Sequence, residues 1–125
     1  MKGQPFTYRL THAWDGLRAA WRMEKSLRTH ALATIAVWGL LIFTRAPGLW
    51  WAVMALTIGL VVACELLNTA LEVLCDHVHP QRHEAIKQTK DIAAAAVLVS
   101  SLAALMVGLA FLVVHVLPWM GWLRR

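Results

Sequence analysis

The chain has 125 residues, of which 59% are hydrophobic and 15% are charged. An ordinary soluble domain is about 45–50% apolar, so the composition excludes that class and predicts an integral membrane protein. The formal net charge is +5, but the basic residues stand between long apolar runs and do not gather on one face. This arrangement favours contact with anionic lipid head groups over nucleic acid.

The first predicted element is an amphipathic helix over residues 6–28. One of its faces is apolar and includes Leu10, Trp14, Leu17 and Trp21, whereas the other is basic and includes Arg18, Arg22, Lys25 and Arg28. A helix of this kind lies in the membrane–water interface, with tryptophan at the head-group boundary. We therefore expect an N-terminal surface helix ahead of the membrane spans.

Three membrane helices are expected after it, over residues of about 29–44, 49–76 and 91–117. Pro47 and Gly48 break the chain between the first two, and Trp50 and Trp51 begin the second as an aromatic belt. The segment 77–89 contains Pro80 and is expected to be a loop or a short helical connector. The whole chain, 1–125, is thus predicted to be one all-α membrane domain.

The distribution of basic residues predicts the orientation of these spans. Nine of the twelve Lys and Arg residues lie in the N-terminal segment and the 77–90 connection, and three lie in the turn at Arg45 and the C-terminal tail. The positive-inside rule then places the N-terminus in the cytoplasm. We expect a multi-pass protein of a bacterial cytoplasmic membrane.

A stripe of polar residues stands at the end of the second span. Nineteen residues without a formal charge, 46–64, precede it. At about 100° per residue its members share roughly 80° of a helix surface; they are Glu65, Asn68, Glu72 and Asp76. Acids inside a membrane are rare and are usually functional, although the stripe can also be read as polar contacts that join helices.

These residue types suit different chemical roles. Glu65 lies deepest and can act as a general base, whereas Glu72 lies nearer water and can bind a divalent cation through oxygen. Asn68 can orient a hydroxyl or a phosphate. Lys90 can neutralise phosphate charge, and Asp91 can cap the third span or contact a ligand.

Two other readings remain open from the residues alone. A small non-enzymatic membrane protein, such as a transporter subunit, would use Glu65 to couple protons or cations, although such an acid is expected nearer the bilayer midplane. A structural zinc site would use the histidines around Asp76, but His77 and His79 do not have the usual zinc-ligand spacing.

Several motifs together resemble one family. They are Glu65-Leu-Leu-Asn68-Thr69-Ala-Leu-Glu72 with Asp76, then His83-Glu84, Lys90-Asp91-Ile-Ala-Ala, and upstream Gly16-Leu-Arg-Ala-Ala-Trp21 with Glu24, Arg28 and His30. This set is similar to that of the small prokaryotic integral-membrane diacylglycerol kinases, a family that includes the undecaprenol kinases. The resemblance covers roughly residues 6–115.

The resemblance implies a homotrimer that transfers the ATP γ-phosphate to the primary hydroxyl of diacylglycerol or undecaprenol. It implies that Glu65 is the catalytic base and that Asn68 supports it. It makes Glu24, otherwise an ordinary solvated acid, an Mg²⁺ ligand together with Glu72. The residues implied near the nucleotide are Gln81, Arg82, His83, Lys90 and Asp91.

Overall fold

The computed structural model describes residues 3–125, and every regular element in that range is helical. In chain order the elements are α1 (Phe6–Met23), α2 (Lys25–Phe43), α3 (Gly48–Val78), α4 (Glu84–Phe111), a π-helical turn η1 (Leu112–Val116) and α5 (Leu117–Leu123). The all-α prediction is confirmed.

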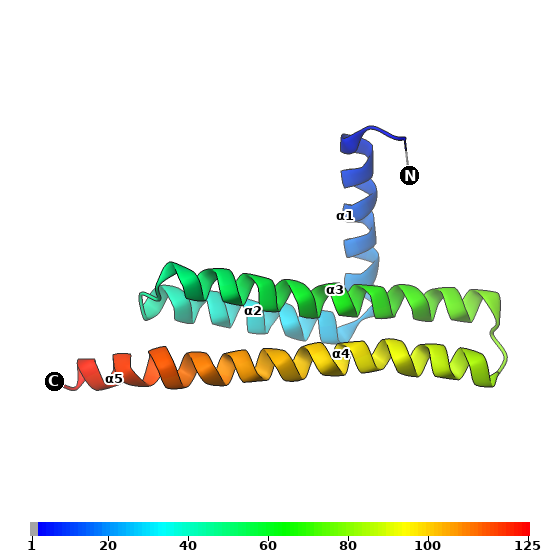
Figure 1. Cartoon of the computed structure of the whole chain (residues 1–125). Helices are drawn as coiled ribbons and strands as arrows, with labels where there is room; N and C mark the ends of the chain where they lie inside the picture. Colours follow the sequence, from blue (N-terminus) through cyan, green and yellow to red (C-terminus); the bar gives the residue numbers. More distant parts are fainter. Residues whose placement is uncertain (1–2) are drawn as a thin grey trace.

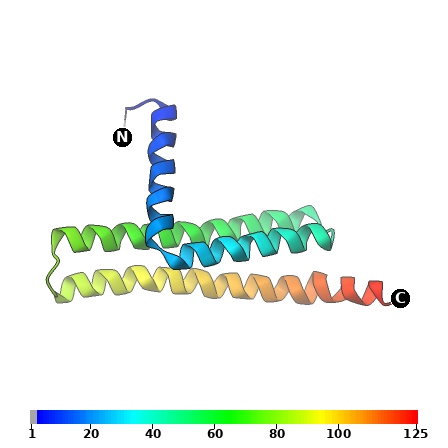
Figure 2. The same ribbon diagram turned by 180° about the vertical axis from the view of Figure 1, so that it is seen from behind.

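Three long helical segments lie side by side and α1 stands across them (Figures 1 and 2). The segments α2, α3 and α4 through α5 are each long and apolar enough to cross a membrane. Their lengths differ, with 19 residues in α2, 31 in α3 and 40 in the continuous segment Glu84–Leu123. At 1.5 Å per residue, α2 matches a hydrocarbon core of about 30 Å, whereas α3 exceeds it by about 16 Å.

The predicted single helix over residues 6–28 is wrong, because the chain bends at Glu24. This residue has extended backbone angles (φ −115°, ψ 113°), so α1 ends at Met23 and α2 begins at Lys25. The Arg28 side chain donates hydrogen bonds to the carbonyl oxygens of Trp21 and Arg22, at 3.0 and 3.2 Å, at the end of α1. These bonds satisfy carbonyls that a helix end leaves without a partner.

The turn between α2 and α3 is closed by Arg45, which has a left-handed φ of 51°. The amide of Arg45 bonds to the carbonyl of Ile42, and the amide of Ala46 bonds to that of Leu41. This is the Schellman pattern of helix termination, in which glycine is the usual left-handed residue. Pro47 then precedes α3 and Gly48 is its first residue, so the chain reverses at Arg45 and not at the glycine.

The best-buried apolar cluster lies beside this turn. Leu41, Met54, Phe111 and Val116 are each 7% exposed or less, and Trp38, Trp50 and Trp51 pack against them. The ring of His115, within η1, lies 3.0 Å from Thr44 Oγ1 and 3.2 Å from its carbonyl oxygen. This contact ties the C-terminal part of the third long segment to the α2–α3 turn.

The connection between α3 and α4 is shorter than predicted. The sequence predicts a loop or connector over 77–89 and a span that begins near residue 91, but α3 continues to Val78 and α4 begins at Glu84. The side chain of His83 accepts a hydrogen bond from the Ala85 amide and caps α4. Asp91 therefore lies inside a helix, and the expectation that it caps the third span is wrong.

Candidate functional site

The predicted polar stripe of α3 runs from the interior of the bundle to its surface. Glu65 is 6% exposed and buried, Asn68 and Glu72 are half-buried, and Asp76 is exposed. The gradient arises because α3 extends past the start of α2, so the end of its polar face has fewer neighbours. The prediction that Glu65 lies deeper than Glu72 is confirmed, because Glu65 is buried and Glu72 is half-buried.

The Glu65 carboxylate faces His30 of α2. The Nδ1 atom of His30 lies 2.8 Å from Glu65 Oε1, which is an ion-pair distance, although the angles are not those of a well-formed hydrogen bond. The other carboxylate oxygen, Oε2, is buried and has no hydrogen-bond partner in residues 3–125. A buried carboxylate with one contacted oxygen and one available oxygen suits a group that accepts a proton.

Asn68 and Glu72 lie one turn apart on the same face. The Asn68 amide Nδ2 donates a long hydrogen bond, 3.5 Å, to Glu72 Oε1. The amide oxygen of Asn68 is buried and, within the part of the chain that the structure describes, has no hydrogen-bond partner. Two oxygen ligands that suit a hard cation or a hydroxyl group are thus held next to each other.

Lys90 of α4 meets the exposed end of this face. Its Nζ donates a hydrogen bond to Asp76 Oδ1 at 2.5 Å, and Lys87 pairs with Asp91 one turn away at 2.7 Å. Lys90 precedes the uncharged run 92–117. Its ammonium group has a pKa raised above the usual lysine value, chiefly because Asp76 accepts its hydrogen bond and also because nearby negative charge favours the protonated form.

The residues implied near the nucleotide lie at the same end of the α3–α4 pair. Gln81 and Arg82 are exposed between the two helices, and the Gln81 carbonyl lies 2.9 Å from the Nδ1 atom of His79. The rings of His79 and His83 are in edge contact, with centroids 5.2 Å apart. Between residues 3 and 125, no three His, Cys, Asp or Glu side chains form a group that could hold a metal ion.

Glu24 is half-buried at the bend between α1 and α2, where α1 contacts both α2 and α3. No hydrogen bond or ion pair joins the Glu24 side chain to Glu72 or to any other described residue. Its side chain is therefore placed by the α1–α2 bend and not by a partner. His30 is a functional candidate that the sequence did not single out, although it belongs to the set of motifs that carries the resemblance.

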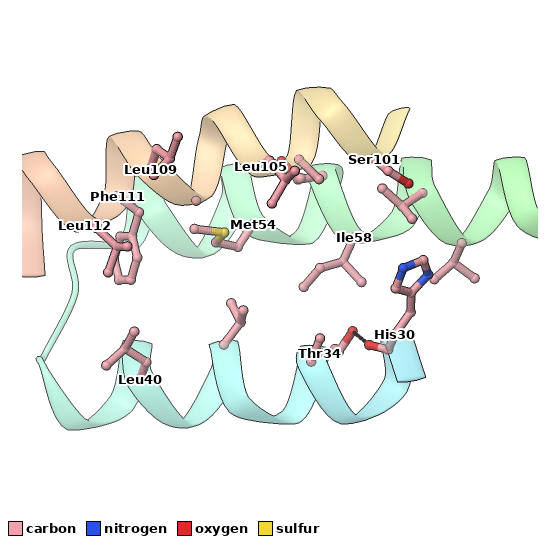
Figure 3. Close-up of a pocket in the computed structure, with 17 residues that line it drawn as sticks. His30, Thr34, Leu40, Met54, Ile58, Ser101, Leu105, Leu109, Phe111 and Leu112 are labelled. Atoms are coloured by element: carbon pink, nitrogen blue, oxygen red, sulfur yellow. Dashed lines mark hydrogen bonds between the residues drawn. The ribbon is translucent and has the colours of Figure 1, made fainter. Parts of the chain in front are cut away.

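An apolar cavity of about 640 Å³ extends from His30 along the bundle (Figure 3). Its walls come from α2, α3, α4 and the first residue of η1, and most of its lining is apolar, as with Met54, Ile58 and Leu105. His30 lies at one end and Phe111 and Leu112 lie at the other (Figure 3). A cavity of this size and lining can accommodate a hydrocarbon chain.

The comparisons with known proteins agree with one another. Residues 11–112 match the family described as prokaryotic diacylglycerol kinase. The chain is 40% identical over 98 residues to a diacylglycerol kinase of Synechocystis, an alignment that covers 78% of this chain and 56% of that protein. It is 34% identical over 98 residues to the undecaprenol kinase of Bacillus subtilis, covering 78% of this chain and 80% of that protein.

A diacylglycerol kinase of Escherichia coli is 29% identical over 93 residues, covering 74% of this chain and 76% of that protein. The aligned part of the chain thus spans just over half of its Synechocystis relative, about three-quarters of the Escherichia coli relative and four-fifths of the Bacillus subtilis relative. With three helices able to span a membrane, it is a multi-pass membrane protein. The matched range covers most of the chain, and the protein belongs to the prokaryotic diacylglycerol kinase family.

Proposed function

We propose that this protein is an ATP-dependent lipid kinase that phosphorylates the primary hydroxyl of a membrane lipid, either diacylglycerol or undecaprenol. Family membership supports the reaction class, because the relatives are named for these two lipid substrates. The observation that carries the proposal is the buried Glu65 carboxylate, whose Oε2 atom has no partner among residues 3–125. A transporter subunit gains no support from the family or the relatives.

In the proposed reaction, the lipid hydroxyl donates a hydrogen bond to Glu65. As the oxygen of the lipid hydroxyl bonds to the γ-phosphorus of ATP, the bond between that phosphorus and the oxygen that bridges it to the β-phosphate breaks. The hydroxyl proton moves to the Glu65 carboxylate, and ADP leaves with the electron pair of the broken bond. A positioned base and charge neutralisation around the phosphates are the main requirements of phosphoryl transfer.

The donor set fits the Mg²⁺ that the family implies. Glu72 and the partnerless amide oxygen of Asn68 are hard oxygen ligands on one helix face, and Mg²⁺ is typically held by one or two carboxylates plus substrate phosphates and water. Glu24 and Glu72 would hold the ion. When bound, Mg²⁺ would neutralise charge on the ATP phosphates.

Lys90 supplies a fixed positive charge for the nucleotide in this proposal, while Asp76 holds its ammonium group in place. Asp91 and the exposed Gln81, Arg82 and His83 would contact ATP at the cytoplasmic end. The overhang of α3 and α4 beyond α2 supports this location, because it puts these polar groups outside the apolar part of the bundle.

We place α1 in the plane of the membrane surface, with the N-terminus in the cytoplasm of a bacterial inner membrane. Its direction across the bundle (Figure 1) suits this placement. Exposed apolar side chains along it, including Trp14 and Trp21, suit a lipid surface. A homotrimer remains part of the proposal, and it would cover much of the exposed apolar surface of the three long segments.

The test is transfer of labelled phosphate from ATP in mixed micelles that contain Mg²⁺. Diacylglycerol and undecaprenol are offered separately, and Glu65→Gln serves as the control. Transfer to one lipid that is lost in the variant would support the kinase and identify its substrate. Absence of transfer to either lipid, with folded protein of native oligomeric state, would contradict the proposed function.

A further inference from the structure

We propose that His30 positions the catalytic base. In this proposal the His30 ring holds one oxygen of the Glu65 carboxylate in place, so that the other oxygen faces the lipid hydroxyl. The inference deepens the proposed function and rests on it. The inference is based on a difference between the two carboxylate oxygens of Glu65. Oε1 lies 2.8 Å from His30 Nδ1, whereas Oε2 has no hydrogen-bond partner in the described chain.

A glutamate carboxylate needs such a restraint. Rotation about its last side-chain bond is broad and roughly two-fold, so without a partner either oxygen can face the substrate at many angles. Misplacement of a reacting group by about 1 Å can lower a rate by about 100-fold. A close contact on one oxygen, such as the 2.8 Å approach of His30 Nδ1 to Oε1, restricts this freedom and leaves the other oxygen available to accept the proton.

His30 is itself held at two places along α2. Its carbonyl oxygen accepts a 2.7 Å hydrogen bond from Thr34 Oγ1, one turn further on. Leu27, one turn earlier, is buried at the α1–α2 bend, where Arg28 ties α2 to the end of α1. The imidazole is therefore presented from a constrained helix segment, and its side chain is one-third exposed whereas that of Glu65 is 7% exposed.

The surroundings of His30 leave Glu65 as its ionisable partner. On the α4 side, the group that lines the same cavity end is the uncharged hydroxyl of Ser101 (Figure 3). On α2, the charged side chain nearest in sequence, Arg28, is bonded to carbonyls of α1. Within residues 3–125, the contact with Glu65 is the one polar side-chain contact of the His30 ring.

Three substitutions distinguish positioning from other roles. His30→Ala removes the ring nitrogen that contacts Glu65 Oε1. His30→Asn restores an N–H at the position of Nδ1, because both nitrogens are attached to Cγ, whereas His30→Gln places its amide one bond further out. Thr29→Val is the matched control, since Thr29 is the exposed neighbour of His30 on α2, does not line the cavity, and bonds through its hydroxyl only to the Lys25 carbonyl one turn back.

Steady-state phosphate transfer to the lipid substrate is measured for folded protein, with a thermal unfolding curve for each variant. We expect His30→Ala to lower kcat about 10- to 100-fold and to leave the KM for lipid and for ATP within about two-fold of the wild type. His30→Asn should regain kcat to within about five-fold of the wild type, His30→Gln should regain less, and Thr29→Val should stay near the wild type.

The other outcomes each overturn a particular statement. Unchanged kcat in His30→Ala would remove the positioning role, and a raised lipid KM with unchanged kcat would make His30 a lipid-binding residue instead. Equal loss of kcat and of thermal stability in the Ala and Asn variants would make its role structural. If the wild-type chain transfers no phosphate, the proposed function fails first, and that result is distinct from all three.

Discussion

Asp76 and Lys90 are fourteen residues apart in the chain, yet a 2.5 Å hydrogen bond joins Lys90 Nζ to Asp76 Oδ1 across the α3–α4 connection. The pair aligns the polar end of α3 with the polar end of α4. Since both groups are solvent-accessible, the bond orients Lys90 more than it stabilises the fold.

Asp76→Asn should lower thermal stability slightly at low salt, and the difference from the wild type should shrink as salt screens the pair. The pKa of Lys90 is raised in the folded state, so the contribution of the pair is fully present below the unfolded lysine pKa and is lost as pH rises through the folded value. Thermal unfolding in detergent at neutral and strongly alkaline pH checks this. A difference that persists unchanged in strong alkali and high salt would contradict it.

Glu65→Gln should lower kcat by about 10²- to 10⁴-fold, because an amide cannot accept the hydroxyl proton. Thermal stability should change little, since the amide fits the same space. Glu84→Gln, at the exposed start of α4, is the matched control and should retain activity. Retention of wild-type kcat by the Glu65 variant would rule out its role as base.

Glu72→Gln should raise the Mg²⁺ concentration required for half-maximal activity by about ten-fold or more, because it removes a negatively charged oxygen ligand. Activity is titrated against Mg²⁺ at saturating ATP and lipid. Asp15→Asn, on the exposed surface of α1, is the control for loss of one acid. An unchanged Mg²⁺ requirement would exclude Glu72 as a ligand.

Arg45→Gly should stabilise the fold by about 0.5–1 kcal/mol, because residue 45 has a left-handed φ of 51° that glycine adopts without the steric strain of a Cβ atom. Arg45→Ala removes the same charged side chain but keeps Cβ, so it serves as the matched variant. Thermal or denaturant unfolding in detergent compares the two. Greater stability of the alanine variant would show that the left-handed backbone is not the source of strain.

Thr44→Val should destabilise the protein by about 1–2 kcal/mol. Thr44 is 1% exposed, and its hydroxyl contacts both the Leu40 carbonyl and the His115 ring, so the substitution leaves the half-buried His115 ring with only the Thr44 carbonyl as a polar contact in the described part of the chain. Thr11→Val, whose hydroxyl bonds one turn back on the exposed helix α1, should change stability by less than about 0.5 kcal/mol. Equal effects at the two sites would argue against a special role for the His115 contact.

The polar stripe could be predicted from spacing because all of its members belong to one helix. Helical periodicity alone puts Glu65, Asn68, Glu72 and Asp76 on a common face, whatever else packs against it. The start of α4 could not be placed in the same way. Its polar first turns give no hydrophobic signal, and the cap that begins it, His83, is not a typical capping residue.

The break at Glu24 shows the same limit. Neither proline nor glycine is present there, and helical periodicity continues through it, so the pattern predicts one helix. At this bend α1 and α2 take different directions. The Arg28 side chain bonds to the carbonyls that the end of α1 leaves without a helical partner. A side chain four residues beyond the break cannot be recognised as its cap from sequence.

The sequence by itself determined the membrane character, the three apolar segments and the order of acids on α3, because these depend on composition and on a local helical period. Only the tertiary structure decided which side chain meets Glu65 and which meets Asp76. Both contacts join residues on different helices, and the packing of α2 and α4 against α3 brings them together. Local periodicity contains no information about that packing.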